Sequence, residues 1–331
     1  MSQTQIVTHG DFDGIVSAAL VGIWSRLRFV FFTGPENVRR TQIGPKDIVC
    51  DLPHPAREVR AWFDHHAGNI EEAKAMGWSA GEGAAFEARS AARVIYEHLK
   101  ATAAFPDFIE QTVRATDRVD SMDYPNIEAW LAEDPENVIN ATIFLPGEDI
   151  TKARRYLQRL VHMIQNRPLS DVAEHSEVRD RYKLQQEHGQ RALETIERVG
   201  RLVAQDEICV IDFSEMKVTP RFSKNLAYQV FPGVYAVIMI TPVVQGGRRT
   251  NDLRLSFSLN PFIDQTLADH SCAAIFDALE LGGGHAAAAG GKIHAESKDD
   301  RQRLRDKMID DVARLWLLQV ETHRQPASVT G

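Results

Sequence analysis

Short apolar runs alternate with longer segments of helical periodicity in the first part of the chain, and this alternation constrains the fold more than any other feature. The runs that predict strands cover residues 5–8, 28–32, 47–52 and 61–64, and the helical patterns cover residues 15–27, 84–100 and 106–116. Strands and helices that alternate in this way favour a mostly parallel sheet flanked by helices. The predicted fold class is therefore α/β.

Carboxylates and imidazoles follow three of the predicted strands. They are His9, Asp11 and Asp13 after the first, Asp51 after the third, and Asp64, His65 and His66 after the fourth. Ligands of open α/β sheets bind beyond the carboxyl ends of the strands, so we expect these side chains to meet at one edge. Oxygen ligands with a minority of histidine favour Mn²⁺ or Mg²⁺ over zinc, and the set is large enough for two ions.

Each of these clusters alone has a simpler explanation. Asp13 precedes Gly14 and is placed where an aspartate caps a helix, while Asp51 precedes Leu52 and Pro53 as a turn residue does. A single Asp-His-His triplet is also weak evidence. All three clusters in order, each behind an apolar run, are hard to explain as caps and turns, and we therefore favour the metal site.

The second half of the chain predicts a different architecture. Residues 151–203 are charged and helical in pattern, which indicates a connector. Strands are expected at 207–213, 235–240 and 253–259, with a hairpin turn at Gln245, Gly246 and Gly247, and helices at 223–231, 264–281 and 299–318. We therefore expect domains at 1–150 and 204–331, the second a smaller α+β domain, with the active site in the cleft between them.

A glycine-rich segment, Gly282, Gly283, Gly284 and His285, stands between a predicted helix and an alanine-rich run. Glycines let backbone N–H groups approach an anion, and a following helix N-terminus would add its positive dipole end. A helix C-cap with a tight turn is the alternative. Beside the metal motifs we favour a phosphate-binding role, with His285 as a donor.

Composition excludes several classes of protein. The chain has 331 residues, 44% of them hydrophobic, and a net charge of −8, which disfavours a protein that holds long duplex DNA on a basic surface. Cys50, Cys209 and Cys272 are widely spaced and predict neither a disulfide framework nor a structural zinc site. The N-terminus lacks the pattern of a signal peptide, and no apolar run approaches the roughly 20 residues of a membrane span. We expect a cytoplasmic protein.

The order of the motifs resembles the DHH phosphoesterase superfamily with its C-terminal DHHA1 domain, which includes RecJ-like, oligoribonuclease-like and exopolyphosphatase-related proteins. The resemblance covers nearly the whole chain. It implies a DHH domain at 1–150 and a substrate-binding DHHA1 domain at 204–331. The implied ligands are His9, Asp11 and Asp51 for one metal and Asp13, Asp51 and His65 for a second, with Asp51 bridging. Asp64 would fix the imidazole tautomer and His66 would face the substrate phosphate.

Two points of the resemblance stay open. The family uses a further aspartate, for which Asp120 fits the local pattern best and Asp117 is the rival. Members often carry an arginine where this chain has Ser258, so Arg254 or Arg221 would have to supply the cation. Arginines in such positions are more often ordinary surface residues. The departure leaves the substrate open, whereas the metal chemistry does not depend on it.

These observations predict a two-metal phosphoesterase that uses Mn²⁺, with Mg²⁺ as the alternative. A metal-bound hydroxide would hydrolyse a phosphodiester, phosphomonoester or phosphoanhydride of a small nucleotide or a short single-stranded oligonucleotide. The expected partner is such a phosphorylated molecule, without a membrane, and a homodimer is left open. The alternatives are an exopolyphosphatase-like activity and a non-catalytic nucleotide or nucleic-acid binding module with the same fold.

Overall fold

The computed structural model describes residues 4–263 and 270–324, with side chains described up to residue 319. The chain divides into two compact units, Met1–Gln186 and Glu187–Gly331, which are described separately below. The helix α9 (Ser176–Val199) spans the boundary. None of the described helices has the length and apolar character that crossing a membrane requires.

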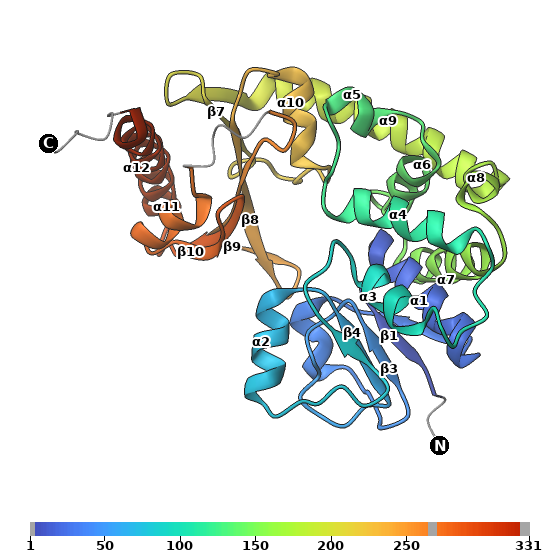
Figure 1. Cartoon of the computed structure of the whole chain (residues 1–331). Helices are drawn as coiled ribbons and strands as arrows, with labels where there is room; N and C mark the ends of the chain where they lie inside the picture. Colours follow the sequence, from blue (N-terminus) through green and yellow to red (C-terminus); the bar gives the residue numbers. More distant parts are fainter. Residues whose placement is uncertain (1–3, 264–269, 325–331) are drawn as a thin grey trace, which may run out of the picture. The chain divides into compact units, whose positions relative to one another are not determined.

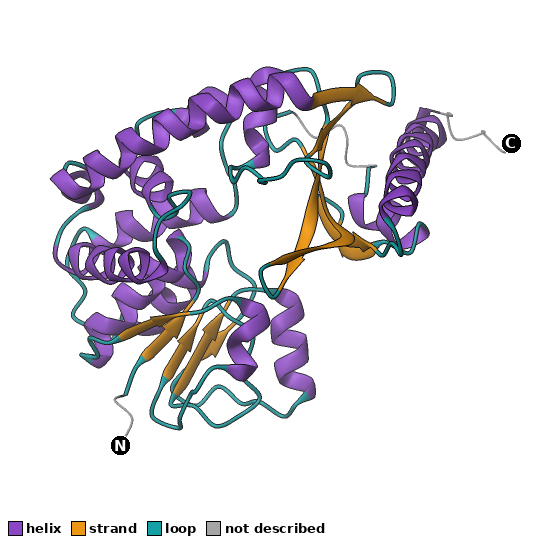
Figure 2. Ribbon diagram, turned by 180° about the vertical axis from the view of Figure 1, so that it is seen from behind, coloured by secondary structure: helices purple, strands orange, loops and turns teal. Residues whose placement is uncertain are grey.

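Unit 1 is an α/β unit (Figures 1 and 2). Its elements are β1 (Ile6–Thr8), α1 (Phe12–Ser25), β2 (Val30–Phe32), η1 (Pro35–Arg40), β3 (Ile48–Cys50), β4 (Ala61–Asp64), α2 (Ala67–Ala75), β5 (Ala84–Ala85), α3 (Ala91–Leu99), α4 (Ile109–Asp120), α5 (Ile127–Leu131), α6 (Pro135–Thr142), α7 (Ile150–Asn166) and α8 (Leu169–Ala173). The strands pair in the order β2-β1-β3-β4-β5, and every pair is parallel. The predicted parallel sheet is confirmed.

Both faces of this sheet are buried, each in a separate hydrophobic core. Successive residues of a strand point to opposite faces and so enter different cores. In β1, Ile6 joins the core beneath α1, α3, α4 and α7, whereas Val7 joins a second core beneath η1 and α2. Trp62 in the middle of β4 fills the second core and donates its indole N–H to the Leu52 carbonyl at 2.8 Å. The strands therefore read as continuous apolar runs, as strands covered on both faces do.

Unit 2 is built on a mixed six-stranded sheet. Its elements are β6 (Gly200–Val203), β7 (Ile208–Asp212), η2 (Lys224–Leu226), α10 (Ala227–Val230), β8 (Ala236–Gln245), β9 (Arg248–Leu259), α11 (Cys272–Ala278), β10 (Gly282–His285), β11 (Ala288–Ile293) and α12 (Lys298–Arg324). The strand order is β10-β11-β9-β8-β7-β6, antiparallel except between β7 and β8. Leu255, Phe257 and Trp316 lie in the core that this sheet shares with α11 and α12. The second α+β part of the predicted fold class is confirmed.

The turn between β8 and β9 has the predicted hairpin form. Gly246 and Gly247 have φ values of 55° and 75°, which suits the two central positions of a two-residue hairpin turn. The segment expected as a helical connector supplies α7 and α8, whose residues Tyr156, Leu160 and Val172 are buried in the core of unit 1.

Two expected helices differ in the structure. The pattern at 84–100 contains the short strand β5, and the helix α3 begins only after Ser90, whose hydroxyl accepts the Arg93 N–H at 3.0 Å. The expected helix at 264–281 is described only as α11, because residues 264–269 lie outside the described part of the chain.

The interpretation of the glycine-rich segment as a turn that opens a helix is wrong. Gly282–His285 forms β10, and the alanine-rich run continues as β11, paired antiparallel with it. Glycines at 290 and 291 disfavour a helix after this segment. Pairing of Ala289 with Phe257 and of Ile293 with Leu253 places apolar side chains of β11 in the core instead.

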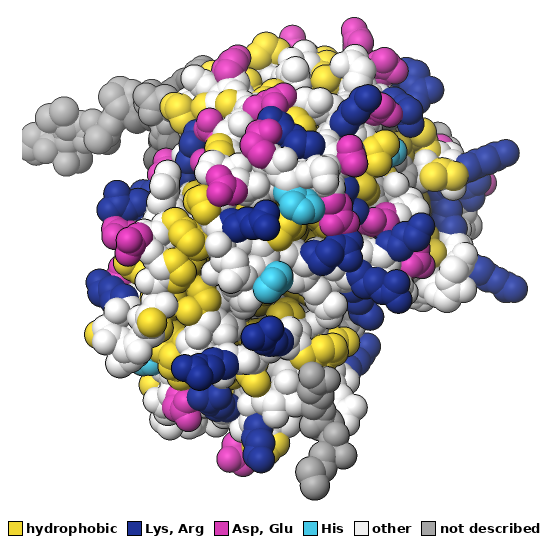
Figure 3. All heavy atoms as spheres, turned by 90° about the vertical axis from the view of Figure 1, so that its right-hand side faces the viewer, with side chains coloured by type: hydrophobic (Ala, Val, Ile, Leu, Met, Phe, Trp, Pro, Cys, Tyr) yellow, Lys and Arg dark blue, Asp and Glu magenta, His cyan; other side chains and the backbone are white. Residues whose placement is uncertain are grey.

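Charges of both signs are interspersed over much of the face shown in Figure 3. This agrees with a chain that carries 38 basic and 46 acidic residues. That face presents a mixed surface rather than one of a single sign.

Candidate metal centre

The polar residues that follow β1, β3 and β4 lie together at the carboxyl edge of the first sheet. β2 pairs with one side of β1, and β3 pairs with the other side, so the strand order reverses between β1 and β3. Ligands of open α/β sheets bind at such a reversal. Three groups of possible ligands have their atoms within 4.8 Å of one another. They are His9, Asp11 and Asp51; Asp13, His65 and Asp120; and Asp51, Asp64, His65 and His66.

The first group is organised by the start of α1. Asp11 is the N-cap of this helix, and its Oδ1 accepts the Gly14 N–H at 2.9 Å. Its Oδ2 lies 2.6 Å from Nδ1 of His9, and the same nitrogen lies 3.9 Å from Oδ2 of Asp51. The capping role that Asp13 was given as an alternative therefore belongs to Asp11, which performs it with one oxygen.

The second group surrounds Nε2 of His65. This nitrogen lies 3.4 Å from Oδ2 of Asp120, 3.8 Å from Oδ2 of Asp13 and 3.8 Å from Oδ1 of Asp51. The Ala88 carbonyl lies 3.1 Å from His65 Nδ1, which fixes the ring and turns Nε2 toward the three carboxylates. Nε2 is buried and has no hydrogen-bond partner among the described residues. A buried ring nitrogen aimed at three carboxylates fits a metal ligand.

Asp51 lies next to the histidines of both groups. Its Oδ2 faces His9, while its Oδ1 faces His65 and lies 3.9 Å from Nδ1 of His66. Its backbone has φ 50°, a left-handed conformation that is uncommon for a residue other than glycine, and its N–H donates to the Phe63 carbonyl at 2.9 Å. The two oxygens of one carboxylate are therefore presented to two separate ligand groups.

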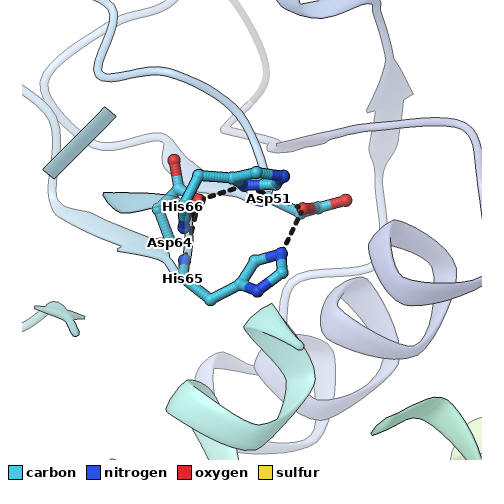
Figure 4. A group of neighbouring side chains, drawn as sticks. All are labelled: Asp51, Asp64, His65 and His66. Atoms are coloured by element: carbon cyan, nitrogen blue, oxygen red, sulfur yellow. Dashed lines mark hydrogen bonds and ion pairs between the residues drawn. The ribbon is translucent and has the colours of Figure 1, made fainter. Parts of the chain in front are cut away.

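Asp64 serves as a scaffold for the histidine pair (Figure 4). It is fully buried, and its Oδ1 accepts the N–H groups of His65 and His66 at 2.7 and 3.1 Å and lies 2.8 Å from Nδ1 of His66. Its Oδ2 accepts Nδ2 of Asn69 at 2.7 Å. Three of these four contacts join Oδ1 to the histidine pair itself, so the geometry suits positioning of His66 better than direct metal contact. Asn69, which follows His66 by three residues at the start of α2, belongs to no motif in the sequence and is found only in the structure.

Asp13 is held by the N-terminus of another helix. The N–H groups of Ala91 and Ala92 donate to its two oxygens at 2.6 and 2.8 Å, and the side chain is buried. These are free N–H groups at the first turn of α3, where a negative charge is stabilised. Nothing in the sequence near Asp13 indicates this contact, because its partners follow it by nearly eighty residues.

The structure separates the two rival aspartates of α4. Asp117 accepts the Ser90 hydroxyl at 2.7 Å and the Arg93 Nε and Nη2 at 2.9 and 2.5 Å, so its carboxylate is committed to an internal ion pair. Asp120 at the end of the same helix faces His65. Geometry therefore favours Asp120 as the ligand.

The site carries more negative charge than its own histidines balance. Burial, together with the charges of Asp120 and Asp11, raises the pKa of Asp13 to about 7. Burial and the charge of Asp11 raise the pKa of Asp120 to about 6, and burial raises the pKa of Asp51 well above its ordinary value. A protein normally avoids crowding carboxylates in this way unless a cation neutralises them. The donor set fits one or two divalent cations.

The substrate residues expected in the second half lie in unit 2. Gly283, Gly284 and His285 are exposed on the edge strand β10, and Arg254 is exposed on β9. Arg221 is exposed ahead of η2. Ser258, at the position of the missing arginine, is buried in β9.

No family model matches the chain, and no curated protein matches it by sequence. The solved structure of the pGpG-specific phosphodiesterase PggH from Vibrio cholerae has a TM-score of 0.70 and 21% sequence identity, over 94% of this chain and 99% of that one. The structure of RecJ from Thermus thermophilus in complex with Mn²⁺ has a TM-score of 0.51 and 14% identity, over 98% of this chain and 52% of that one. The chain therefore shares the fold of these two proteins, in agreement with the fold that its motifs predicted.

Proposed function

We propose that this protein is a divalent-metal-dependent phosphoesterase. Its substrate is a small nucleotide or a short single-stranded oligonucleotide that carries a phosphodiester, phosphomonoester or phosphoanhydride bond. The observation that carries the proposal is the buried Nε2 of His65, which has no hydrogen-bond partner in the described part of the chain and faces the carboxylates of Asp13, Asp51 and Asp120. The shared fold with PggH and with RecJ supports the same class of reaction.

The residues that would hold two cations are those of the first two ligand groups. His9, Asp11 and Asp51 would bind one ion, and Asp13, His65 and Asp120 the other. Asp51 would serve both, since its Oδ1 lies 3.8 Å from Nε2 of His65. Oxygen-rich sets of this kind suit Mn²⁺ and Mg²⁺, and we propose Mn²⁺ as the first choice. When bound, such ions lower the pKa of a nucleophilic water and stabilise charge on the phosphoryl oxygens.

His66 would contact the substrate phosphate, and Asp64 and Asn69 would orient its ring. The hydrogen bond that Nδ1 of His66 donates to the carboxylate of Asp64 raises the pKa of His66, so its ring is more readily protonated. Because Nδ1 faces Asp64, Nε2 is left to donate to a phosphate oxygen. Asn69 and the backbone N–H groups of His65 and His66 hold Asp64 itself in place. The ring is thus oriented before the substrate arrives, which lowers the cost of binding the charged phosphate.

The direct test is Asp51→Asn, assayed with Mn²⁺ on a panel of dinucleotides, short oligonucleotides, nucleoside phosphates and polyphosphate. We expect the wild type to hydrolyse at least one nucleotide substrate, and the variant to lose at least about 100-fold in rate because one carboxylate serves both ligand groups. Asp123→Asn is the matched control, since Asp123 is exposed and pairs with Arg89 on the surface. A fully active Asp51→Asn protein, or a wild type inactive on the whole panel, would overturn the proposal. Preferred hydrolysis of polyphosphate would assign the exopolyphosphatase alternative.

A further inference from the structure

A pocket lies at the end of α1 that is remote from the ligand groups. This rear pocket has a volume of about 390 Å³, which is within the range of small-molecule sites. α1 has 14 residues and is therefore about 20 Å long. Asp11 and Asp13 stand at its start, whereas Gly22 and Arg26 line the rear pocket at its end. The rear pocket is thus separate from the candidate metal centre of the same unit.

The charged side chains described at the rear pocket are basic. Arg26 and Arg28 line it together with the imidazole of His162, and none of the described residues that line it is acidic. The C-terminal ends of α1 and α7 reach this pocket and stabilise nearby cations. Within the described part of the chain, however, neither guanidinium group makes a hydrogen bond or an ion pair. All of their N–H groups are therefore available to an anionic ligand.

Arg26 is held in a conformation that glycine adopts more readily. It is the C-cap of α1 with φ 60°, and its N–H donates to the Gly22 carbonyl at 3.0 Å. Glycine is the usual residue at a helix end of this left-handed form. An arginine strains the backbone there, so its presence favours a purpose for the side chain rather than a role in ending the helix.

Two amide side chains give the rear pocket hydrogen-bond acceptors. Nε2 of Gln158 donates to the Val30 carbonyl at 3.0 Å, and Nε2 of Gln165 donates to the Ala19 carbonyl at 3.4 Å. A Cβ at Gly22 would lie 2.1 Å from Nε2 of Gln165, so the bare backbone of α1 makes room for this amide. Both nitrogens face carbonyls, and no described residue donates to the amide oxygens. These oxygens are left to accept from a hydroxyl group or an N–H group of a ligand.

The apolar part of the lining consists of Ile23, Leu27, Ala104, Pro106 and Val161. Small-molecule sites combine such walls with a few convergent polar groups. Two guanidinium groups match the double charge and the oxygens of a phosphate monoester. Inorganic phosphate alone would leave the amide oxygens and the apolar walls without contacts, so the ligand should also have an organic body.

We propose that the rear pocket binds a small phosphate monoester whose body carries hydroxyl groups, as a sugar phosphate does. Arg26 and Arg28 hold the phosphate, and the oxygens of Gln158 and Gln165 accept from the hydroxyl groups. The proposal does not rest on the phosphoesterase function, because the rear pocket shares no residue with the ligand groups of the candidate metal centre.

The test measures binding by calorimetry. Wild-type protein in EDTA, which removes any cation through which the candidate metal centre could hold a phosphate, is titrated with ribose 5-phosphate, ribose, inorganic phosphate and citrate. We expect one ribose 5-phosphate per chain and weaker binding of the other three. Arg28→Met should weaken binding of ribose 5-phosphate about tenfold, the scale of a lost charge-assisted hydrogen bond. Arg314→Met is the charge control, because Arg314 is exposed and pairs with Asp311 on α12.

Arg26→Gly provides the second arm. Glycine suits φ 60°, so the Tm should stay the same or rise while binding of ribose 5-phosphate weakens about tenfold. Loss of binding in this variant therefore cannot come from unfolding.

Gln165→Met tests the part of the pocket that holds the body of the ligand. It keeps a long side chain over Gly22 but removes the amide oxygen, so ribose 5-phosphate should bind more weakly while inorganic phosphate binds as it does to the wild type. The proposal is overturned if the wild type binds no ribose 5-phosphate, if it prefers citrate, or if both arginine variants bind ribose 5-phosphate like the wild type.

Discussion

The two ends of α1 present opposite chemistry. The edge of the first sheet gathers carboxylates around a histidine nitrogen that has no partner among the described residues, whereas the rear pocket gathers guanidinium groups that no described carboxylate balances. Divalent cations would complete the first set and an anion the second. The first set therefore agrees with the proposed function, and the second adds a ligand site that shares no residue with it.

At the edge of the first sheet, we expect the largest effect on the hydrolysis rate from substitution of Asp120, and a different effect from substitution of Asp117. Asp120→Asn should lower the hydrolysis rate about 100-fold with little change in stability, because its carboxylate faces His65. Asp117→Asn should instead lower the free energy of unfolding by about 1–3 kcal/mol, because Arg93 and Ser90 lose the buried carboxylate that they share and Arg93 keeps only Glu97. Rates and urea denaturation of both variants measure this. The reverse pattern would reassign the ligand.

Loss of the hydrogen bond between Asn69 and Asp64 should lower the hydrolysis rate by less. Asn69→Ala removes the donor to Oδ2 of Asp64, and we expect the rate to fall about tenfold while the affinity for Mn²⁺ is kept. Steady-state kinetics and a metal titration measure the two quantities. A rate equal to that of the wild type would show that Asp64 positions His66 without the hydrogen bond from Asn69.

The crowded carboxylates also predict how the metal-free protein responds to pH. The pKa of Asp13 rises from 3.8 to about 7 on folding and that of Asp120 to about 6, so both bind protons more tightly in the folded state. Their contribution to stability is complete below pH 3.8 and is lost as the pH rises toward 7. In EDTA, Tm should fall by roughly 3–6 °C between about pH 5 and about pH 8.

Added Mn²⁺ should restore the Tm at the higher pH. It should have little effect on the Tm at the lower pH, where protons already neutralise the carboxylates. Asp13→Asn should flatten the dependence of Tm on pH. Thermal unfolding at both pH values, with and without Mn²⁺, decides the matter. The same Tm at the higher pH with and without Mn²⁺ would count against a cation site at this edge.

The smallest effect lies outside both regions, in the hairpin of β10 and β11. A Cβ at Gly284 would lie 2.2 Å from the Ala288 carbonyl oxygen, whereas one at Gly283 would meet nothing within 4 Å. Gly284→Ala should therefore cost about 1–3 kcal/mol in the free energy of unfolding, and Gly283→Ala should cost nothing. Urea denaturation of the two variants makes the comparison. Equal stability would show that β10 shifts to accept the methyl group.

The sequence predicted the edge of the first sheet better than the glycine-rich hairpin of the second. Apolar runs followed by Asp51 or by Asp64 carry local information, because a parallel strand delivers its next residues to a known edge. The hairpin of β10 and β11 could not be read in this way, since its glycines and alanines have no periodicity and the pairing with β9 decides their conformation. The choice of Asp120 over Asp117 depended on the contact with Arg93, which joins two helices.

The central claim is that the edge of the first sheet binds two divalent cations through ligand groups that share Asp51. Titration of Mn²⁺ into the metal-free protein, followed by calorimetry and by the EPR signal of free Mn²⁺, tests it most directly. We predict two equivalents per chain in the wild type and weakened binding of both in Asp51→Asn. Binding of no Mn²⁺ by the folded wild type, or undiminished binding of two equivalents by Asp51→Asn, would contradict the claim.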